Sequence, residues 1–221
     1  MPNIYSHNND GRIYHTNANW VTVRDAATGT SAVDTSTSDA YAIRGERTAA
    51  RGGGYQYSIG RAFMYFQTSI IAHDIKEAAL NIYGYSQGGG QVIPVKATSD
   101  ISTLTTVDYD AIEGWVSGSA DGAAGGDNLA NVTTYSVNAT IWNTSGYNSF
   151  VLNQDALNDL RKDDVFYVCL MNYTHDLRDM IPTGYASNRN GLYFNEQTGT
   201  SKDPYISYTL RENANFIGTN F

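Results

Sequence analysis

The chain of 221 residues contains little cysteine, proline or charge. Its single cysteine, Cys169, excludes an internal disulfide framework, and its place in the apolar run DVFYVCLM predicts a small buried side chain. Four prolines and 21 glycines are typical of an ordered chain with many turns. Charged residues make up only 16% of the chain, so its surface must consist largely of neutral hydrogen-bonding groups, unlike that of a highly charged disordered segment.

Clusters of positive charge and long apolar runs are also missing. The net charge is −8, and the densest basic stretch (Arg44, Arg47, Arg51 and Arg61) is interrupted by acids and glycines, which argues against nucleic acid as a partner. No apolar run reaches the roughly 18 residues of a membrane span. The N-terminus lacks a basic region followed by an apolar stretch, so we expect no signal peptide, and synthesis in a reducing cytoplasm or export by a route that needs no signal.

The usual metal and catalytic motifs are absent from the sequence. The histidines stand apart, without HExxH or Cys/His ligand spacing, at positions His7, His15, His73 and His175. We therefore expect no catalytic residue, no metal site and no cofactor. A structural Ca²⁺ held by loop carboxylates and carbonyls is the alternative that the acidic loops leave open.

Acidic residues cluster in DYDAIEGW (108–115) and HDLRD (175–179). A glycosidase needs two carboxyl groups that face each other across about 5 to 10 Å. If the chain cleaved glycans, Asp110 and Glu113 would be the residues to test. Acid-bearing loops are common in β-sandwiches, so the enzyme is the less favoured hypothesis.

Alternating apolar residues predict a series of β-strands. The runs 61–68, 78–85, 91–98, 164–171 and 204–210 each place apolar side chains on one face, and 164–171 is apolar on both faces, as in a central strand. Pro94 predicts an edge position or a bulge, because proline cannot donate a hydrogen bond to a neighbouring strand. In the last run Ile206, Tyr208 and Leu210 are expected to point inward.

One short helix is predicted at 153–163, with Asn153 as N-cap, Asp155 in the first turn, and Arg161 and Lys162 at its end. Segments 28–41, 45–58 and 118–131 are predicted to be surface loops, where binding residues usually lie. Residues 1–210 are expected to form a single domain with an N-terminal arm or first strand at 1–24. The tail 211–221 is a candidate docking segment because of its apolar residues Phe216, Ile217 and Phe221.

The composition is unusually rich in tyrosine, with 17 tyrosines and three tryptophans. Trp20, Trp115 and Trp142 lie near small polar residues, and their rings are candidate contacts for glycans or partner proteins. The alternative is that each tryptophan anchors the core or an end of the sandwich. Tyrosines on outward strand faces would suit a protein–protein contact.

Several ordered segments together resemble jelly-roll modules of the DNRLRE and carbohydrate-binding-module type. GRAFMYFQTSI (60–70) and IKEAALNIYGY (75–85) are similar to the family's opening strands, and TTVDYDAIEGW (105–115) to its Asp-to-Trp segment. The stretches 147–171 and 191–210 resemble its helix with central strand and its closing strand, and 8–30 resembles the N-terminal arm of phage virion members. Asn195 and Gln67 replace the usual Ser and Asp, and the DNRLRE signature is not intact.

The resemblance implies an all-β antiparallel sandwich of the jelly-roll type and a non-enzymatic role in a bacteriophage particle. We expect a capsid or tail surface decoration protein, assembled in the host cytoplasm, that binds neighbouring virion proteins and forms a homo-oligomer. A carbohydrate-binding module for host surface glycans is the alternative, and it predicts a row of exposed aromatic rings.

Overall fold

The computed structural model describes residues 2–33, 37–70, 75–98, 103–116, 130–184, 188–196 and 198–211. The protein is all-β and antiparallel, as the sequence predicts. Its strands are β1 (Asn3–Tyr5), β2 (Gly11–Asn17), β3 (Ser31–Val33), β4 (Ser38–Ala49), β5 (Tyr55–Gln67), β6 (Ile75–Gly88), β7 (Gln91–Lys96), β8 (Thr140–Ile141), β9 (Tyr147–Val151), β10 (Val165–Asn172), β11 (Arg189–Tyr193) and β12 (Tyr205–Leu210). Its helical elements are α1 (Trp20–Arg24), the 3₁₀ turn η1 (Thr106–Asp108), α3 (Gln154–Lys162) and the π-helical turn η2 (Tyr173–Leu177).

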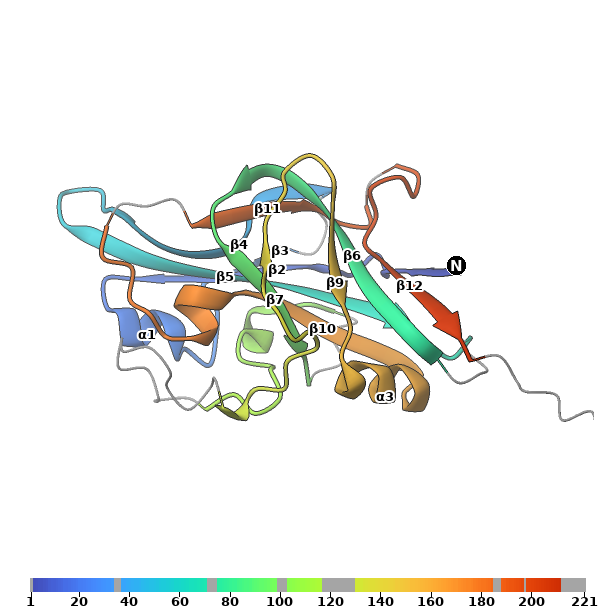
Figure 1. The fold of residues 1–221 in the computed structure, drawn as a ribbon. Coiled ribbons are helices and arrows are strands. Elements are labelled where there is room, and N and C mark those ends of the chain that lie inside the picture. The colour runs from blue at the N-terminus through green and yellow to red at the C-terminus, as the bar shows by residue number, and fades with distance from the viewer. Residues whose placement is uncertain are drawn as a thin grey trace, which may run out of the picture.

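The strands form one curled antiparallel sheet (Figure 1). Its main path runs β1-β12-β6-β11-β4-β5-β10-β7-β8. Off this path β9 pairs with β6, β2 pairs with β5, and β3 pairs with β2. The long strand β6 pairs with β12 and β9 along its first part and with β11 at Gly84 and Gly88, so it belongs to both layers of the curl. The all-β antiparallel class is therefore confirmed, while the jelly-roll topology within it stays a prediction.

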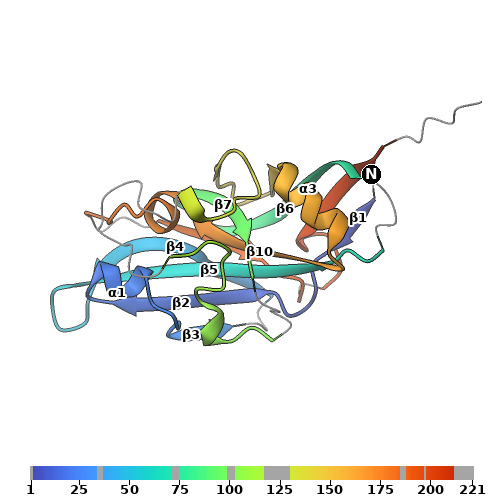
Figure 2. The same ribbon diagram turned by 90° about the horizontal axis from the view of Figure 1, so that it is seen from below.

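Two hydrophobic clusters lie on opposite faces of β5 and β10. Ala62, Met64 and Phe66 of β5 pack in the first cluster, together with the apolar faces of β6, β9, β12 and α3. Phe63 and Tyr65 point the other way, into a second cluster with α1, β7 and the segments around η1. Figure 2 shows the strands β5, β10 and β7 and the helix α1 that contribute to this cluster. These alternating faces are those that the sequence predicts, and β10 is buried on both sides between β5 and β7.

The helix α3 is confirmed with its predicted ends. The Asn153 side chain accepts a hydrogen bond from the backbone N–H of Ala156, as an N-cap does. Leu157 and Leu160 are buried, and Arg161 and Lys162 occupy the last turn. The edge position predicted from Pro94 was wrong, because β7 lies between β10 and β8. The carbonyl of Pro94 accepts a hydrogen bond from the backbone N–H of Tyr135, on the side of β7 beyond the two residues that pair with β8.

Two predicted loops and the inward direction of Leu210 were wrong. Segment 45–58 is not a loop: β4 and β5 form a long hairpin whose turn contains three glycines with positive φ, Gly52, Gly53 and Gly54. Segment 28–41 likewise contains β3 and the start of β4. Leu210 is exposed because it ends β12, whereas Ile206 and Tyr208 point inward as expected. Segment 1–24, for which the sequence predicts an N-terminal arm or first strand, contains β1, β2 and α1.

Candidate functional site

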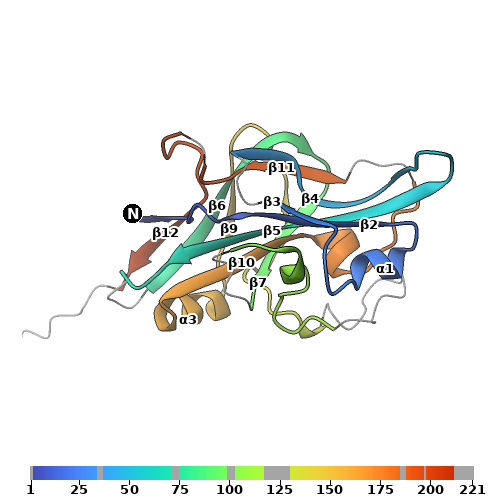
Figure 3. The same cartoon turned by 180° about the vertical axis from the view of Figure 1, so that it is seen from behind.

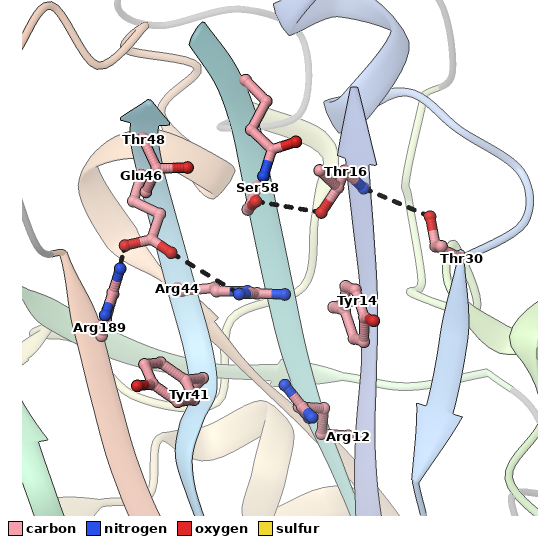
Figure 4. A pocket seen from close by; sticks show the side chains of 11 residues that line it. Arg12, Tyr14, Thr16, Thr30, Tyr41, Arg44, Glu46, Thr48, Ser58 and Arg189 are labelled. Carbon is pink, nitrogen blue, oxygen red and sulfur yellow. Dashed lines mark hydrogen bonds and ion pairs between the residues drawn. The ribbon is translucent and has the colours of Figure 1, made fainter. Parts of the chain in front are cut away.

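A shallow pocket of about 570 Å³ lies on one face of β2, β4, β5 and β11 (Figure 4). Alternation along each strand brings polar side chains to this face, since residues two apart in a strand point the same way. The volume falls within the roughly 300–1,000 Å³ of typical ligand pockets. The lining residues are Arg12, Tyr14, Thr16, Thr30, Tyr41, Arg44, Glu46, Thr48, Gln56, Ser58 and Arg189.

Strand register places three of the lining residues in a single row across the sheet, together with Gly60. Tyr14 of β2 and Arg44 of β4 both pair with Gly60 of β5, and Arg189 of β11 pairs with Arg44. Gly60 carries no side chain, and a Cβ atom there would lie 3.0 Å from Arg44 Cγ. The glycine therefore leaves room for the Arg44 side chain to lie across β5.

Three guanidinium groups converge on the pocket, and two carboxylates accompany them. Arg12 Nε lies 2.7 Å from an oxygen of Asp39. Glu46 lies between Arg44 and Arg189: its Oε1 is 3.6 Å from Arg44 Nη1, and its Oε2 accepts a hydrogen bond from Arg189 Nε. Three positive charges thus face two negative ones, in a chain whose net charge is −8.

Aromatic rings support the guanidinium groups. The Cζ atoms of Arg44 and Arg12 lie 4.6 and 4.9 Å from the centre of the Tyr14 ring. Arg189 Cζ lies 4.8 Å from the centre of the Tyr41 ring. Such cation–π contacts hold the guanidinium groups in place without neutralising their charge. Tyr41 keeps a substantial part of its side chain in solvent.

Burial and neighbouring charges shift the pKa values of Arg44 and Arg189. Burial lowers the pKa of Arg44, Glu46 raises it and Arg12 lowers it further. The hydrogen bond to Glu46 raises the pKa of Arg189. Among the described residues, Arg44 Nε has no hydrogen-bond partner. The positive charge at Arg44 is therefore only partly compensated within the protein.

Hydroxyl groups line the side of the pocket nearer the β4–β5 turn. The hydroxyl oxygens of Thr16 and Ser58 are 3.1 Å apart and share a hydrogen bond, and Thr30 Oγ1 accepts one from the backbone N–H of Thr16 (Figure 4). Glu46 is the one acid among the lining residues, and it is engaged by two arginines. This arrangement suits recognition of a polar ligand better than general acid–base catalysis, which needs a carboxyl group able to exchange a proton with the substrate.

The acids of the HDLRD segment have a structural role on the opposite face of β5. Asp176 is fully buried and receives two hydrogen bonds from Arg61, at 2.7 and 2.8 Å. Asp179, also buried, accepts a hydrogen bond from Trp20 Nε1 at 2.7 Å and lies 3.4 Å from Arg24 Nε. These paired charges join η2 to β5 and α1.

The second acidic segment has local partners too. Asp108 accepts hydrogen bonds from Thr105 at the start of η1. Glu113 forms an ion pair with Lys96 at 3.0 Å and accepts a hydrogen bond from Thr133. His175 does not pair with Asp176, because its ring nitrogens contact the carbonyl of Met180 and the side chain of Asn188.

The tryptophans do not form the exposed row that the carbohydrate-binding alternative predicts. Trp20 and Trp142 are buried, the latter donating a hydrogen bond from Nε1 to the carbonyl of Gly191. Trp115 is partly buried against the second cluster, with the guanidinium groups of Arg24 and Arg61 over its ring. Their large apolar rings anchor the interior, which was the alternative interpretation.

Six tyrosines instead form a row on the layer that contains β1, β12, β9, β6 and β11. Neighbouring rings lie 5.0 to 5.8 Å apart, most of them edge to face. In order along the row they are Tyr5, Tyr205, Tyr147, Tyr83, Tyr193 and Tyr85. Lys202 Nζ lies 4.3 Å from the centre of the Tyr193 ring. We call this the tyrosine row.

The remaining sequence-based candidates divide into three groups. Phe216, Ile217 and Phe221 lie outside the described residues, as does most of segment 118–131. Cys169 is buried as predicted, and burial raises the pKa of its thiol. Within the described ranges, no three His, Cys, Asp or Glu side chains gather in a way that could hold a metal ion.

The pocket was not predicted from the sequence. Arg44, Glu46 and Thr48 alternate with other residues, as do Gln56, Ser58 and Gly60, and this period of two was the available signal for a polar hairpin face.

Comparison with protein-family models and with curated proteins gave no match. In the part of the chain that the structure describes, no helix is long and apolar enough to cross a membrane.

Proposed function

We propose that this chain is a non-enzymatic binding module of a bacteriophage particle and that it recognises saccharides through the pocket on β2, β4, β5 and β11. The observation that carries the proposal is the lining of the pocket: guanidinium groups, tyrosine rings and hydroxyls surround about 570 Å³, and its one acid is held by arginines. The setting in a virus particle rests on the resemblance to jelly-roll modules of phage virion proteins.

The lining chemistry matches what a sugar offers to a protein. Sugar hydroxyls both donate and accept hydrogen bonds, and Arg, Thr, Ser and Gln side chains supply complementary groups. The apolar face of a sugar ring packs on aromatic rings, for which Tyr41 provides an exposed surface. These contacts need no chemical step, which agrees with a binding role.

A matched pair of tyrosine variants tests the location of the site. Tyr41 and Tyr55 are 40% and 41% exposed, but only Tyr41 lines the pocket. We expect the wild-type protein to bind members of a glycan array, Tyr41→Ala to lose at least about tenfold in affinity, and Tyr55→Ala to bind like the wild type. Loss of binding in both variants, or in neither, would contradict saccharide recognition at this pocket.

A second candidate role, decoration of a particle through protein contacts, is favoured by the tyrosine row. Tyrosine is enriched in protein interfaces, and Val151, which is 76% exposed, lies on the same face of β9 as Tyr147. We propose that this face contacts neighbouring virion proteins or further copies of the chain.

The decoration role has its own test. Quantitative mass spectrometry of purified particles should find the chain in defined copy number. Val151→Glu should release it, whereas Val107→Glu, at a 65% exposed valine on η1, should not. Absence of the chain from particles would exclude this role and leave saccharide binding to be judged separately.

A further inference from the structure

The pocket contains an excess of positive charge that the fold alone does not require. Arg44 and Arg189 occupy directly opposed positions on β4 and β11, where like charges repel. The carboxylate of Glu46 serves both of them, and its distance to Arg44, 3.6 Å, is longer than a hydrogen bond. Arg44 therefore has guanidinium donors available toward the pocket.

A second guanidinium group lies beside Arg44. Arg12 and Arg44 both lie within 5 Å of the Tyr14 ring centre, at 4.9 and 4.6 Å, so the two cations gather around one aromatic ring. The side chains of Arg12 and Arg44 are only 14% and 13% exposed. Partial burial weakens screening by water and salt, which strengthens the attraction of such a pair for an anion.

We propose that the pocket selects anionic saccharides, whose acid group binds Arg44 and Arg12 above the Tyr14 ring while the sugar ring lies toward Tyr41, Thr16 and Ser58. The inference rests on the proposed function and adds the chemical class of the ligand. Three arginines against two carboxylates leave one positive charge, which a single acid group on the sugar neutralises. Guanidinium groups suit this role because their planar donors match the two oxygens of a carboxylate, and they bind sulfate in the same way.

The test compares acidic saccharides with neutral forms of the same sugars. Calorimetric titrations of the full chain would use a galacturonic acid trimer and sialyllactose, each against its carboxyl methyl ester, and a sulfated disaccharide as a further arm. We expect at least one acid form to bind about tenfold or more tightly than its uncharged counterpart, because a charge-assisted hydrogen bond is lost in the ester. Comparison of the affinities for the carboxylated saccharides and for the sulfated disaccharide then shows which acid group the pocket prefers.

Substitutions then locate the contact. Arg44→Gln and, independently, Arg12→Gln should remove the preference for the acid form, with folding of each variant checked by its thermal unfolding curve. Arg51→Gln makes the same change of charge at an exposed position in the β4–β5 turn and should leave the preference intact. Two arginine variants are used so that the result does not depend on the stability of either one.

The outcomes separate the two proposals. Equal binding of acid and neutral forms, weakened by Tyr41→Ala, would overturn the inference about charge and leave saccharide binding at the pocket standing. Binding of acid forms that survives both Arg44→Gln and Arg12→Gln would overturn the assigned contact. Absence of binding to every saccharide on the array and in the titrations would overturn both proposals.

Discussion

Arg44 and Arg189 lie directly opposite each other on neighbouring strands, and the carboxylate of Glu46 contacts both guanidinium groups. Opposed like charges destabilise a strand pair, so this one acid stabilises the pairing of β4 with β11. Arg44, Glu46 and Arg189 therefore affect both the stability of the sheet and the charge of the pocket.

Glu46→Gln should therefore lower the free energy of unfolding. Loss of hydrogen bonds to charged groups costs about 1.5–3 kcal/mol, and the two arginines then repel without compensation. Chemical denaturation measures this change. Glu77→Gln makes the same substitution at an exposed position of β6 and should change the free energy by less than about 0.5 kcal/mol. Equal effects of the two variants would show that Glu46 does not hold the strands together.

Gly60→Ala should disturb the pocket more than the fold. The added Cβ would lie 3.0 Å from Arg44 Cγ and 3.1 and 3.2 Å from the carbonyl oxygens of Ala42 and Tyr41. We expect Arg44 to shift, the affinity for the pocket ligand to fall several-fold, and stability to fall by about 1–2 kcal/mol. Gly184→Ala is the control, because no described atom outside its chain neighbours lies within 4 Å of a Cβ there. Unchanged affinity in Gly60→Ala would argue against the role of Arg44 in binding.

The buried pair of Arg61 and Asp176 should behave as a coupled unit. Asp176→Asn leaves a buried guanidinium group without its counter-charge, and such changes cost about 3–5 kcal/mol. The double variant Arg61→Met, Asp176→Leu should be less destabilised than the sum of its single variants.

The control for this cycle is the exposed ion pair of Lys76 and Glu77, whose charged atoms are 3.8 Å apart. Substitutions in that pair should add within about 0.5 kcal/mol. Additivity at Arg61 and Asp176 as well would mean that their two hydrogen bonds contribute little to stability.

Asp10 should make stability depend on pH. Burial raises the pKa of this carboxyl group well above its ordinary value, the hydrogen bond from Ser6 opposes the shift, and the charge of Glu196 adds to it. Because the folded state binds the proton more tightly, the stabilisation is complete below about pH 4, the unfolded value, and is lost as pH rises through the raised pKa.

The free energy of unfolding measured from pH 4 upward should accordingly fall less in Asp10→Asn than in the wild-type protein. Asp164→Asn, at an exposed residue before β10, serves as the reference and should keep the wild-type profile. Parallel profiles for Asp10→Asn and the wild type would assign the pH dependence to other groups.

Local patterns in the sequence were sufficient to predict much of the fold. The strand faces of β5, β6, β7 and β10 follow from alternation alone, and α3 follows from the cap at Asn153 and its two leucines. These features depend on neighbours within a few residues, where periodicity and capping act directly.

The pocket could not be predicted in the same way because its parts meet only through long-range register. Arg12, Arg44 and Arg189 come from three distant segments, and only the pairing of β2, β5, β4 and β11 brings them together. Segment 45–58 of the β4–β5 hairpin resembles a loop in composition, because it combines charged residues with glycines, although Glu46 forms ion pairs within the sheet. The burial of the tryptophans could not be predicted for a related reason. The polar residues beside each tryptophan in the sequence do not show which distant residues pack on its ring.

The pairing of β1 with β12 fixes the N-terminal strand at one end of the molecule. These strands lie at the end of the molecule opposite the β4–β5 hairpin (Figures 1 and 3). A support or carrier protein attached before β1 would therefore lie at the end of the molecule far from the hairpin. The arginines of the pocket would then remain accessible to a ligand or to a cell surface. Attachment at the hairpin turn would reverse this orientation and crowd the pocket against the support.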